Sequence, residues 1–217
     1  NRWLIALAAI GLHISIGSVY AWSVLTRPIM ADMGFTMSQT TWTFSLAILM
    51  LGLSAGFLGS FAEKIGPKKS GLLSMVFWVA GLFGTAYALS IHNLTLLYLF
   101  YGIIGGIGLG IGYITPVSTL VKYFPKRPGF ATGLAIMGFG FASLIAGPLM
   151  QFLVAQVGLV NNFIILGIIY LVVMGASSLY LKAPQPKQPA RTTKDKSTMY
   201  VHNHGMLAND AMKTWQF

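Results

Sequence analysis

The chain has 217 residues, of which 55% are hydrophobic and 8% are charged, and its mean hydropathy is +0.72. Soluble globular domains carry about 25% charged residues, so this composition excludes a soluble domain and indicates a membrane protein. The formal net charge of +10 does not indicate nucleic acid as a partner. The Lys and Arg residues lie between long apolar stretches and do not gather on one soluble face. Without cysteine, the chain has neither a disulfide framework nor a thiolate nucleophile.

Six uncharged apolar stretches are long enough to cross a bilayer, since about 20 helical residues span a hydrocarbon core of ~30 Å. They lie near residues 3–25, 40–62, 70–90, 94–120, 129–157 and 162–181. The first stretch is too long for the core of a signal peptide, and no clear cleavage site follows it. The sequence therefore predicts an all-α membrane protein, with a bundle of six transmembrane helices over residues 1–181.

The basic residues are distributed unevenly between the two sides of this predicted bundle. One side carries Arg2, Lys64, Lys68, Lys69, Lys122, Lys126, Arg127, Lys182 and every later Lys or Arg, whereas the other side carries Arg27. Cytoplasmic loops retain basic residues, so the basic side is predicted to be the cytoplasm. We expect a multi-pass protein of the plasma (inner) membrane with both ends of this chain in the cytoplasm.

The composition changes abruptly after the sixth stretch. Residues 182–210 are polar and contain several Pro and Lys residues, which predicts a disordered cytoplasmic linker. Residues 211–217, AMKTWQF, turn apolar and aromatic again and predict the start of a seventh transmembrane helix. We expect the sequence to be the N-terminal part of a longer chain, whose second six-helix half packs against this one.

The loop after the second predicted helix reads GSFAEKIGPKKSG over residues 59–71. It resembles the signature loop of the major facilitator superfamily, G-x-L-A-D-R-x-G-R-K. The matching residues are Gly59, Ala62, Glu63, Lys64, Gly66, Lys68 and Lys69. The sequence departs from the signature at Glu63 for Asp, Lys64 for Arg and the inserted Pro67.

This resemblance implies the N-terminal half of a twelve-helix transporter fold, in which the loop acts as a conformational gate on the cytoplasmic side. Gly59 would permit a close helix contact, and Gly66 would permit a tight turn. Glu63 would accept hydrogen bonds from a neighbouring cation or helix N-terminus. The alternative interpretation is a short basic loop without a role in gating.

The segment between the fourth and fifth helices, YFPKRPGFATGLAIMGFGFASLIAGP over residues 123–148, narrows the resemblance. It is similar to the corresponding segment of the oxalate:formate antiporter family and of related monocarboxylate porters. The matching residues are Tyr123, Phe124, Pro125, Lys126, Arg127, Gly129, Ala131, Thr132 and Gly133. The resemblance implies transport of small carboxylates such as oxalate, formate, lactate or pyruvate. We expect Arg127 to belong to the gate and to pair with Glu63.

The first helix carries HISIGSVYAWSVLTRP at residues 13–28, which is again similar to these antiporter relatives. His13, Gly17 and Tyr20 are spaced to share one helix face, with Trp22 adjacent. In the superfamily the first and fourth helices of each half line the central cavity, so the resemblance makes Tyr20 and Trp22 candidates for substrate contact. The alternative is that both belong to the aromatic belt at the outer membrane surface.

His13 is the titratable side chain that lies well inside a predicted span. An ionisable group at that depth warrants a functional hypothesis, because burying it in a membrane is costly. His13 is therefore a candidate to contact an anionic substrate or to relay a proton. The alternative is a neutral imidazole that is hydrogen-bonded across a helix interface.

The fourth helix contains YGIIGGIGLGIGYITP at residues 101–116, with two interleaved rows of glycine. Positions 102, 106 and 110 form one row and positions 105, 108 and 112 form the other, and each row predicts a close helix contact. A dinucleotide-binding loop is excluded, since no strand precedes the glycines. Tyr113 lies just beyond them and is a further candidate for substrate contact, and Pro116 predicts a kink.

The predicted spans contain neither a deep Lys or Arg nor any Asp or Glu. A carboxylate substrate needs a counter-charge or several hydrogen bonds in a low-dielectric path. We therefore expect the cationic anchors in the second half, where the resemblance also places them, with Tyr20 and Tyr113 as hydroxyl donors in this half. The lack of an acidic proton relay favours exchange or facilitated transport over proton symport.

Three other interpretations are open at this point. The chain could belong to a porter of the same superfamily for sugars, nitrate or drugs, or to a six-helix channel or structural protein that associates through its glycines. An enzyme would need a nucleophile with a base, or a metal cluster, and neither pattern is visible. Four scattered His residues do not make a metal site, and no cofactor is expected.

Overall fold

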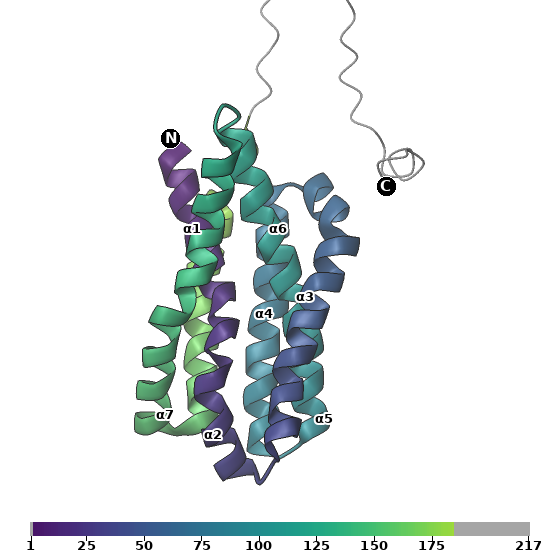
Figure 1. Cartoon of the computed structure of the whole chain (residues 1–217), viewed down its shortest axis with the longest axis vertical. Helices are drawn as coiled ribbons and strands as arrows, with labels where there is room; N and C mark the ends of the chain where they lie inside the picture. Colours follow the sequence, from purple (N-terminus) through teal and green to yellow (C-terminus); the bar gives the residue numbers. More distant parts are fainter. Residues whose placement is uncertain (1, 185–217) are drawn as a thin grey trace, which may run out of the picture. The chain divides into compact units, whose positions relative to one another are not determined.

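The computed structural model describes residues 2–184, and every regular element in that range is helical (Figure 1). Residues 185–217, which hold most of the predicted linker and the predicted start of a seventh helix, lie outside the described residues. The all-α fold class predicted from the sequence is therefore confirmed for the described part of the chain.

The first membrane-length unit covers Arg2–Met33 and consists of three consecutive segments. Helix α1 spans Arg2–Gly17, a 3-10 turn η1 spans Ser18–Ala21, and helix α2 spans Trp22–Met33. A 3-10 turn advances about 120° per residue instead of about 100°, so η1 rotates α2 about 80° beyond the phase of an uninterrupted α-helix.

Helices α3 and α4 form the second and third spans. Helix α3 covers Met37–Ile65 and begins with a capping box, in which the side chains of Thr36 and Gln39 each bond to the other residue's backbone N–H. It ends at Gly66, whose φ of +84° is a conformation that glycine adopts without strain. Pro67 then opens α4, Pro67–Ser90, where a missing N–H costs no helical hydrogen bond.

The fourth span is not a uniform α-helix. A short helix α5, Leu94–Leu97, is capped by the side chain of Asn93 and continues into a π-helical segment η2, Tyr98–Gly105. Helix α6, Gly106–Tyr123, completes the span and contains Pro116. The sequence predicted this span to end near residue 120, and α6 carries three further residues.

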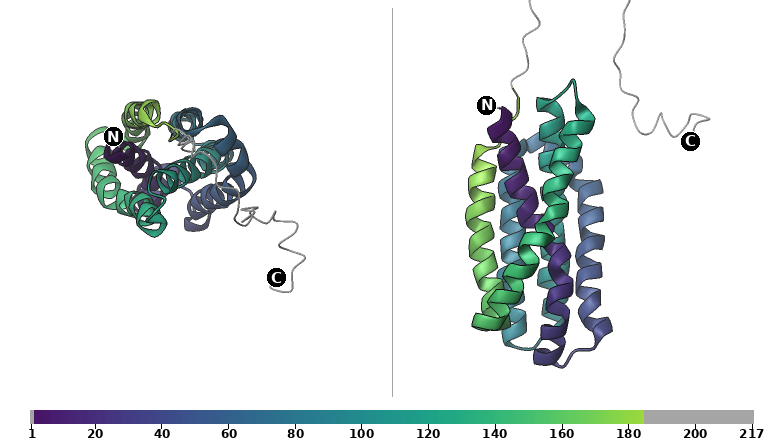
Figure 2. Two further views of the ribbon diagram at one scale, coloured as in Figure 1. Left: turned by 90° about the horizontal axis from the view of Figure 1, so that it is seen from above. Right: turned by 60° about the vertical axis from the view of Figure 1, so that its left-hand side comes forward.

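Helix α7 runs over Pro128–Tyr180 and provides both the fifth and the sixth predicted spans. Its 53 residues would measure about 80 Å as a straight helix, more than twice the hydrocarbon thickness. The chain instead reverses at Gly158, whose φ of 83° and ψ of 172° are not helical. Figures 1 and 2 show the two legs side by side, so five continuous apolar helices correspond to six crossings.

The predicted close helix contacts of the two glycine rows are present, and the rows face two different helices. A Cβ added at Gly102 or Gly106 would meet α3, at 2.9 Å from the Leu46 Cβ and 2.6 Å from the Met50 Cβ, respectively. A Cβ at Gly108 would meet α4, at 2.6 Å from the Trp78 backbone nitrogen. The other members of the two rows are Gly110 against α3, and Gly105 and Gly112 against α4. The fourth span therefore packs backbone to backbone against two neighbours.

We predict that Gly110→Ala destabilises the bundle. The new Cβ would lie 2.5 Å from the Leu51 carbonyl oxygen and 2.8 Å from the Ala55 nitrogen, and backbone atoms cannot rotate away. The clash should cost about 1–3 kcal/mol, which exceeds the gain of at most about 1 kcal/mol from replacing a helical glycine. The thermal midpoint of the purified protein in detergent should fall. Gly140→Ala, in open space on α7, is the matched control and should leave the midpoint equal or higher.

Candidate functional site

Five ring side chains from five elements meet in the middle of the bundle and form what we call the aromatic cluster. Its members are His13 on α1, Tyr20 on η1, Phe44 on α3, Tyr113 on α6 and Phe139 on α7. The Phe139 ring centroid lies 5.3 Å from that of Tyr20, 5.2 Å from that of Tyr113 and 5.7 Å from that of His13. Tyr20 also contacts Phe44 at 6.2 Å. Phe139 is thus the centre of the cluster.

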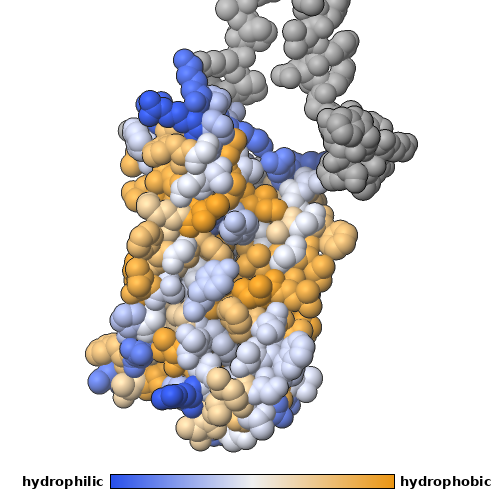
Figure 3. Space-filling view, viewed as in Figure 1, coloured by the Kyte–Doolittle hydropathy of each residue, from blue (hydrophilic) through white to orange (hydrophobic). Residues whose placement is uncertain are grey.

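The members of the aromatic cluster differ in exposure, which gives the cluster an open side and a closed side. Tyr20 is 45% exposed, and Tyr113 and Phe44 are half-buried. Phe139 and His13 are buried behind them. The face formed by α3, α6, α1–α2 and the first leg of α7 shows a pale, weakly polar strip between apolar flanks in Figure 3. The open side of the cluster therefore presents Tyr20, and part of Tyr113, at the surface of this half.

His13 is fully buried and joins three helices through its ring nitrogens. Its Nδ1 lies 2.6 Å from the carbonyl oxygen of Ala135 on α7, and its Nε2 lies 3.0 Å from the carbonyl oxygen of Tyr113 on α6. The ring also stacks on the Tyr113 ring at 5.6 Å. The interface bond that the sequence left as an alternative is present, and both nitrogens take part in such contacts.

Trp22 lies outside the aromatic cluster. It is 3% exposed, and its Nε1 donates to the Thr40 carbonyl oxygen at 3.2 Å. Its ring packs against Tyr101 and Phe163, with centroid distances of 4.3 and 6.5 Å. The rotation introduced by η1 turns Trp22 into the core of the half, away from both the cluster and the outer belt.

Phe139 and Phe44 were not predicted as site residues. Phe139 reaches the centre of the cluster because Gly17 lets α1 and α7 approach so closely that an added Cβ would clash with the Phe139 carbonyl oxygen. The only sequence signal was the glycine beside it on each side, at positions 138 and 140.

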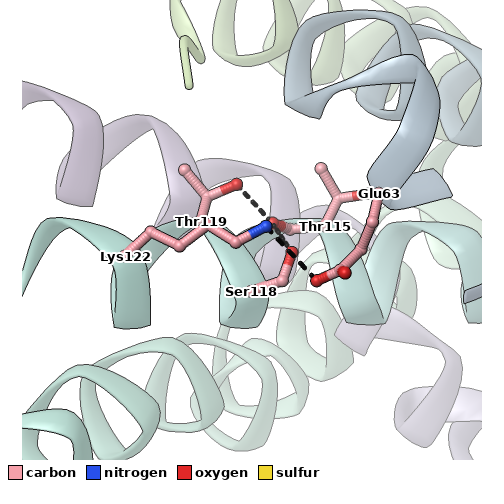
Figure 4. A network of polar contacts seen from close by, with 5 residues as sticks. All are labelled: Glu63, Thr115, Ser118, Thr119 and Lys122. Atoms are coloured by element: carbon pink, nitrogen blue, oxygen red, sulfur yellow. Dashed lines mark hydrogen bonds and ion pairs between the residues drawn. The ribbon is translucent and has the colours of Figure 1, made fainter. Parts of the chain in front are cut away.

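Glu63 of the predicted gate, near the end of α3, forms an ion pair with Lys122 near the end of α6, which was not predicted as a gate residue. The Lys122 Nζ lies 3.4 Å from the Glu63 Oε1. Figure 4 shows the two side chains pointing toward each other beside Thr115, Ser118 and Thr119 of α6. These groups border a small pocket of about 60 Å³ that also includes the Gly66–Pro67 turn. The pocket therefore links the signature loop to the fourth span.

The expected pairing of Glu63 with Arg127 is wrong. Because α6 extends to Tyr123, Lys122 still lies on the helix and faces α3, whereas Arg127 follows in the exposed turn before α7. Lys64, Lys68 and Lys69 are exposed as well.

The local geometry of the two predicted gate glycines allows a close contact at Gly59 and a turn at Gly66, and their part in gating stays a prediction. A Cβ on Gly59 would lie 2.9 Å from the Ile114 Cδ1 of α6, and Gly66 makes the turn described above.

Fixed charge is confined to the ends of the spans. Residues 3–26, 37–62, 70–121 and 128–181 contain no Asp, Glu, Lys or Arg. Within residues 2–184, no group of three or more His, Cys, Asp or Glu side chains could hold a metal ion. The chemistry available at the aromatic cluster is therefore hydrogen bonding from phenols, contact with ring faces, and the titratable imidazole of His13.

Comparison with known proteins identifies one family. The sequence profile of the Major Facilitator Superfamily matches residues 5–215. The chain is 34% identical over 195 residues to the uncharacterized MFS-type transporter YhjX of Escherichia coli (strain K12). It is 28% identical over 217 residues to monocarboxylate transporter 14 of Homo sapiens and 27% identical over 171 residues to the oxalate:formate antiporter of Oxalobacter formigenes.

These alignments cover most of this chain and less than half of each relative. They include 89%, 98% and 78% of the chain, but 47%, 40% and 40% of the respective relatives. The chain therefore spans less than half the length of the curated relatives it matches, and the activity of a whole transporter is a proposal for it.

We predict a weak coupling between Glu63 and Lys122. Both side chains are about half exposed, at 49% and 51%, so water and salt screen their attraction. A double-mutant cycle with Glu63→Gln and Lys122→Gln should give a coupling of roughly 0.2–1 kcal/mol in thermal stability, and the coupling should shrink at high salt. The same cycle with Arg127→Gln is the control and should give none. A larger coupling to Arg127 than to Lys122 would contradict the observed pairing.

Proposed function

We propose that this chain, which belongs to the Major Facilitator Superfamily, forms the N-terminal half of a secondary transporter that moves small carboxylate anions. It is a multi-pass membrane protein and part of a transporter, not an enzyme. The observation that carries the substrate class is the aromatic cluster, in which two phenols stand on the open side of a bundle without internal fixed charge.

The relatives support the same substrate class. Two of them are named as a monocarboxylate transporter and an oxalate:formate antiporter. Oxalate, formate, lactate and pyruvate share a carboxylate that accepts two or more hydrogen bonds, and the hydroxyls of Tyr20 and Tyr113 are donors of the required kind. The flat or short carbon parts of these anions suit the ring faces of the cluster. The second half of the protein would supply the cationic anchors.

The proposed transport cycle is alternating access, with each half moving largely as a rigid body about a central site. In this cycle the half would rotate as a unit, and the contacts of the signature loop would form and break on the cytoplasmic side. The Glu63–Lys122 pair bridges the ends of α3 and α6 at the basic end of the bundle, which we assign to the cytoplasm of an inner-membrane protein. Exchange of one carboxylate for another is the proposed mode, since no acidic residue lies within the spans.

Counter-transport tests the substrate class directly. The full-length protein is reconstituted into liposomes loaded with oxalate, formate, lactate or pyruvate, and uptake of the labelled anion is followed. We expect uptake that depends on internal carboxylate. Parallel vesicles loaded with glucose or nitrate should show no uptake of the corresponding label, and uptake there alone would favour a porter of the same family for another solute.

We predict that Tyr113→Phe weakens carboxylate transport through the loss of one hydroxyl. The ring stays in place against Phe139, so the substitution isolates the hydrogen bond. A hydrogen bond to a charged group contributes about 1.5–3 kcal/mol, so KM should rise roughly 10-fold or more. Tyr20→Phe should behave in the same way.

The matched control for these two variants is Tyr87→Phe. Tyr87 is 57% exposed on α4 and lies outside the cluster, so its loss of a hydroxyl should leave KM unchanged. An unchanged KM in both cluster variants would remove the phenols from the proposed site.

A further inference from the structure

A neutral His13 ring has one N–H too few for the two hydrogen-bond acceptors that surround it. Both of its nitrogens lie within hydrogen-bond distance of backbone carbonyl oxygens, from Ala135 and from Tyr113, and a carbonyl oxygen can only accept. A neutral imidazole has one N–H, so one nitrogen would direct a lone pair at a carbonyl oxygen. The imidazolium has two N–H groups and donates to both carbonyls.

The rings around His13 also suit a cation. Its imidazole lies 5.6 Å from the Tyr113 ring and 5.7 Å from the Phe139 ring, which is within the range of cation–π attraction. Protonation would therefore add two charge-assisted hydrogen bonds and a favourable stacked contact with the Tyr113 ring.

No fixed charge faces His13 from the helices packed against it. From α6 the ionisable neighbour is Tyr113, and from η1 it is Tyr20, which reaches His13 through Phe139. The first leg of α7, residues 128–157, contains no ionisable side chain, and α1 itself carries Arg2 at its far end. Tyr170 and Tyr180 are the ionisable residues of the second leg. His13 is thus the member of the aromatic cluster that can become positive.

We propose that His13 takes up a proton when a carboxylate occupies the aromatic cluster, and that the imidazolium is the positive charge that this half contributes to the substrate site. A hydronium ion transfers its proton to the free lone pair of one ring nitrogen, so that one N–H bond forms, one O–H bond breaks and a water molecule is left. This inference rests on the proposed function, because it needs an anion at the cluster.

The two binding events favour each other through electrostatics. An isolated charge in an apolar environment is costly, and opposite charges a few ångströms apart offset that cost for each other. Linkage then requires that the anion raises proton affinity by the same factor as the proton raises anion affinity. In exchange, the proton would accompany the anion in both directions, so the inference is compatible with exchange.

Proton uptake on anion binding is the decisive measurement. The full-length protein in nanodiscs is titrated with lactate and with oxalate by calorimetry near neutral pH, in buffers that differ in ionisation enthalpy. The buffer dependence of the enthalpy gives the number of protons taken up. We expect about one proton per bound anion, and an affinity that falls as pH rises, since the anion prefers the protonated protein. Labelling with ¹⁵N-histidine should show both His13 nitrogens protonated in the bound state.

The His13→Asn variant isolates the residue, because Asn keeps one N–H donor but cannot take up a proton. Anion affinity should fall by roughly 5- to 150-fold, a typical coupling range, and the residual binding should lose both its proton uptake and its pH dependence. The matched control is His92→Asn. His92 lies exposed at a φ of 53°, a conformation that Asn tolerates, and this variant should match the wild type.

The possible failures are distinguishable. If neither anion nor any other small carboxylate binds the wild type, the proposed function fails and this inference fails with it. If the wild type binds an anion without proton uptake, or if His13→Asn retains proton uptake, the proposed function stands and the role of His13 is refuted. The wild-type calorimetry and the ¹⁵N spectrum decide the question even if the variant does not fold.

Discussion

Helices in lipid gain little hydrophobic free energy by associating with one another, so this bundle depends on close van der Waals contact and hydrogen bonds across its interfaces. The fourth span makes such close contacts on two sides. Its two glycine rows bring its backbone against α3 on one side and α4 on the other, and the Ser74 hydroxyl donates to the Gly108 carbonyl oxygen at 2.7 Å across the second contact. The positions of the other helices around α6 follow from this double contact.

The same close packing brings a buried polar side chain within hydrogen-bond distance of backbone carbonyl oxygens on neighbouring helices. Gly17 brings α1 against α7, and the approach of α1 to α6 lets His13 contact the carbonyl oxygens of Ala135 and Tyr113 at once. A bulkier residue at position 17 would move α1 outward and separate the imidazole from both acceptors. The hydrogen bonds of His13 thus depend on glycine at position 17, because a residue without a side chain allows the short distance between the helices.

The six crossings could be predicted from the sequence because charged residues occur only near the ends of the apolar stretches, and even the reversal at Gly158 falls in the predicted gap between the last two spans. The site was harder to predict because it depends on helix phase. The turn η1 rotates Trp22 into the core, and three extra residues at the end of α6 put Lys122 opposite Glu63. Neither a short 3-10 turn nor the exact end of a helix can be predicted from hydropathy or residue spacing.

The placement of charge also suggests why this half would use a titratable residue instead of a permanent cation. A Lys or Arg beside the aromatic cluster would be an unpaired charge in a low-dielectric surrounding whenever the site is empty, as it is between the release of one anion and the binding of the next. An imidazole can be neutral in the empty site and charged in the occupied one. In the proposed transporter, aromatic walls, two phenols and one buried histidine would bind an anion and would still leave an uncharged interior when the anion leaves. The permanent cations that fix the orientation of a carboxylate would then be needed on one side of the site only, in the second half.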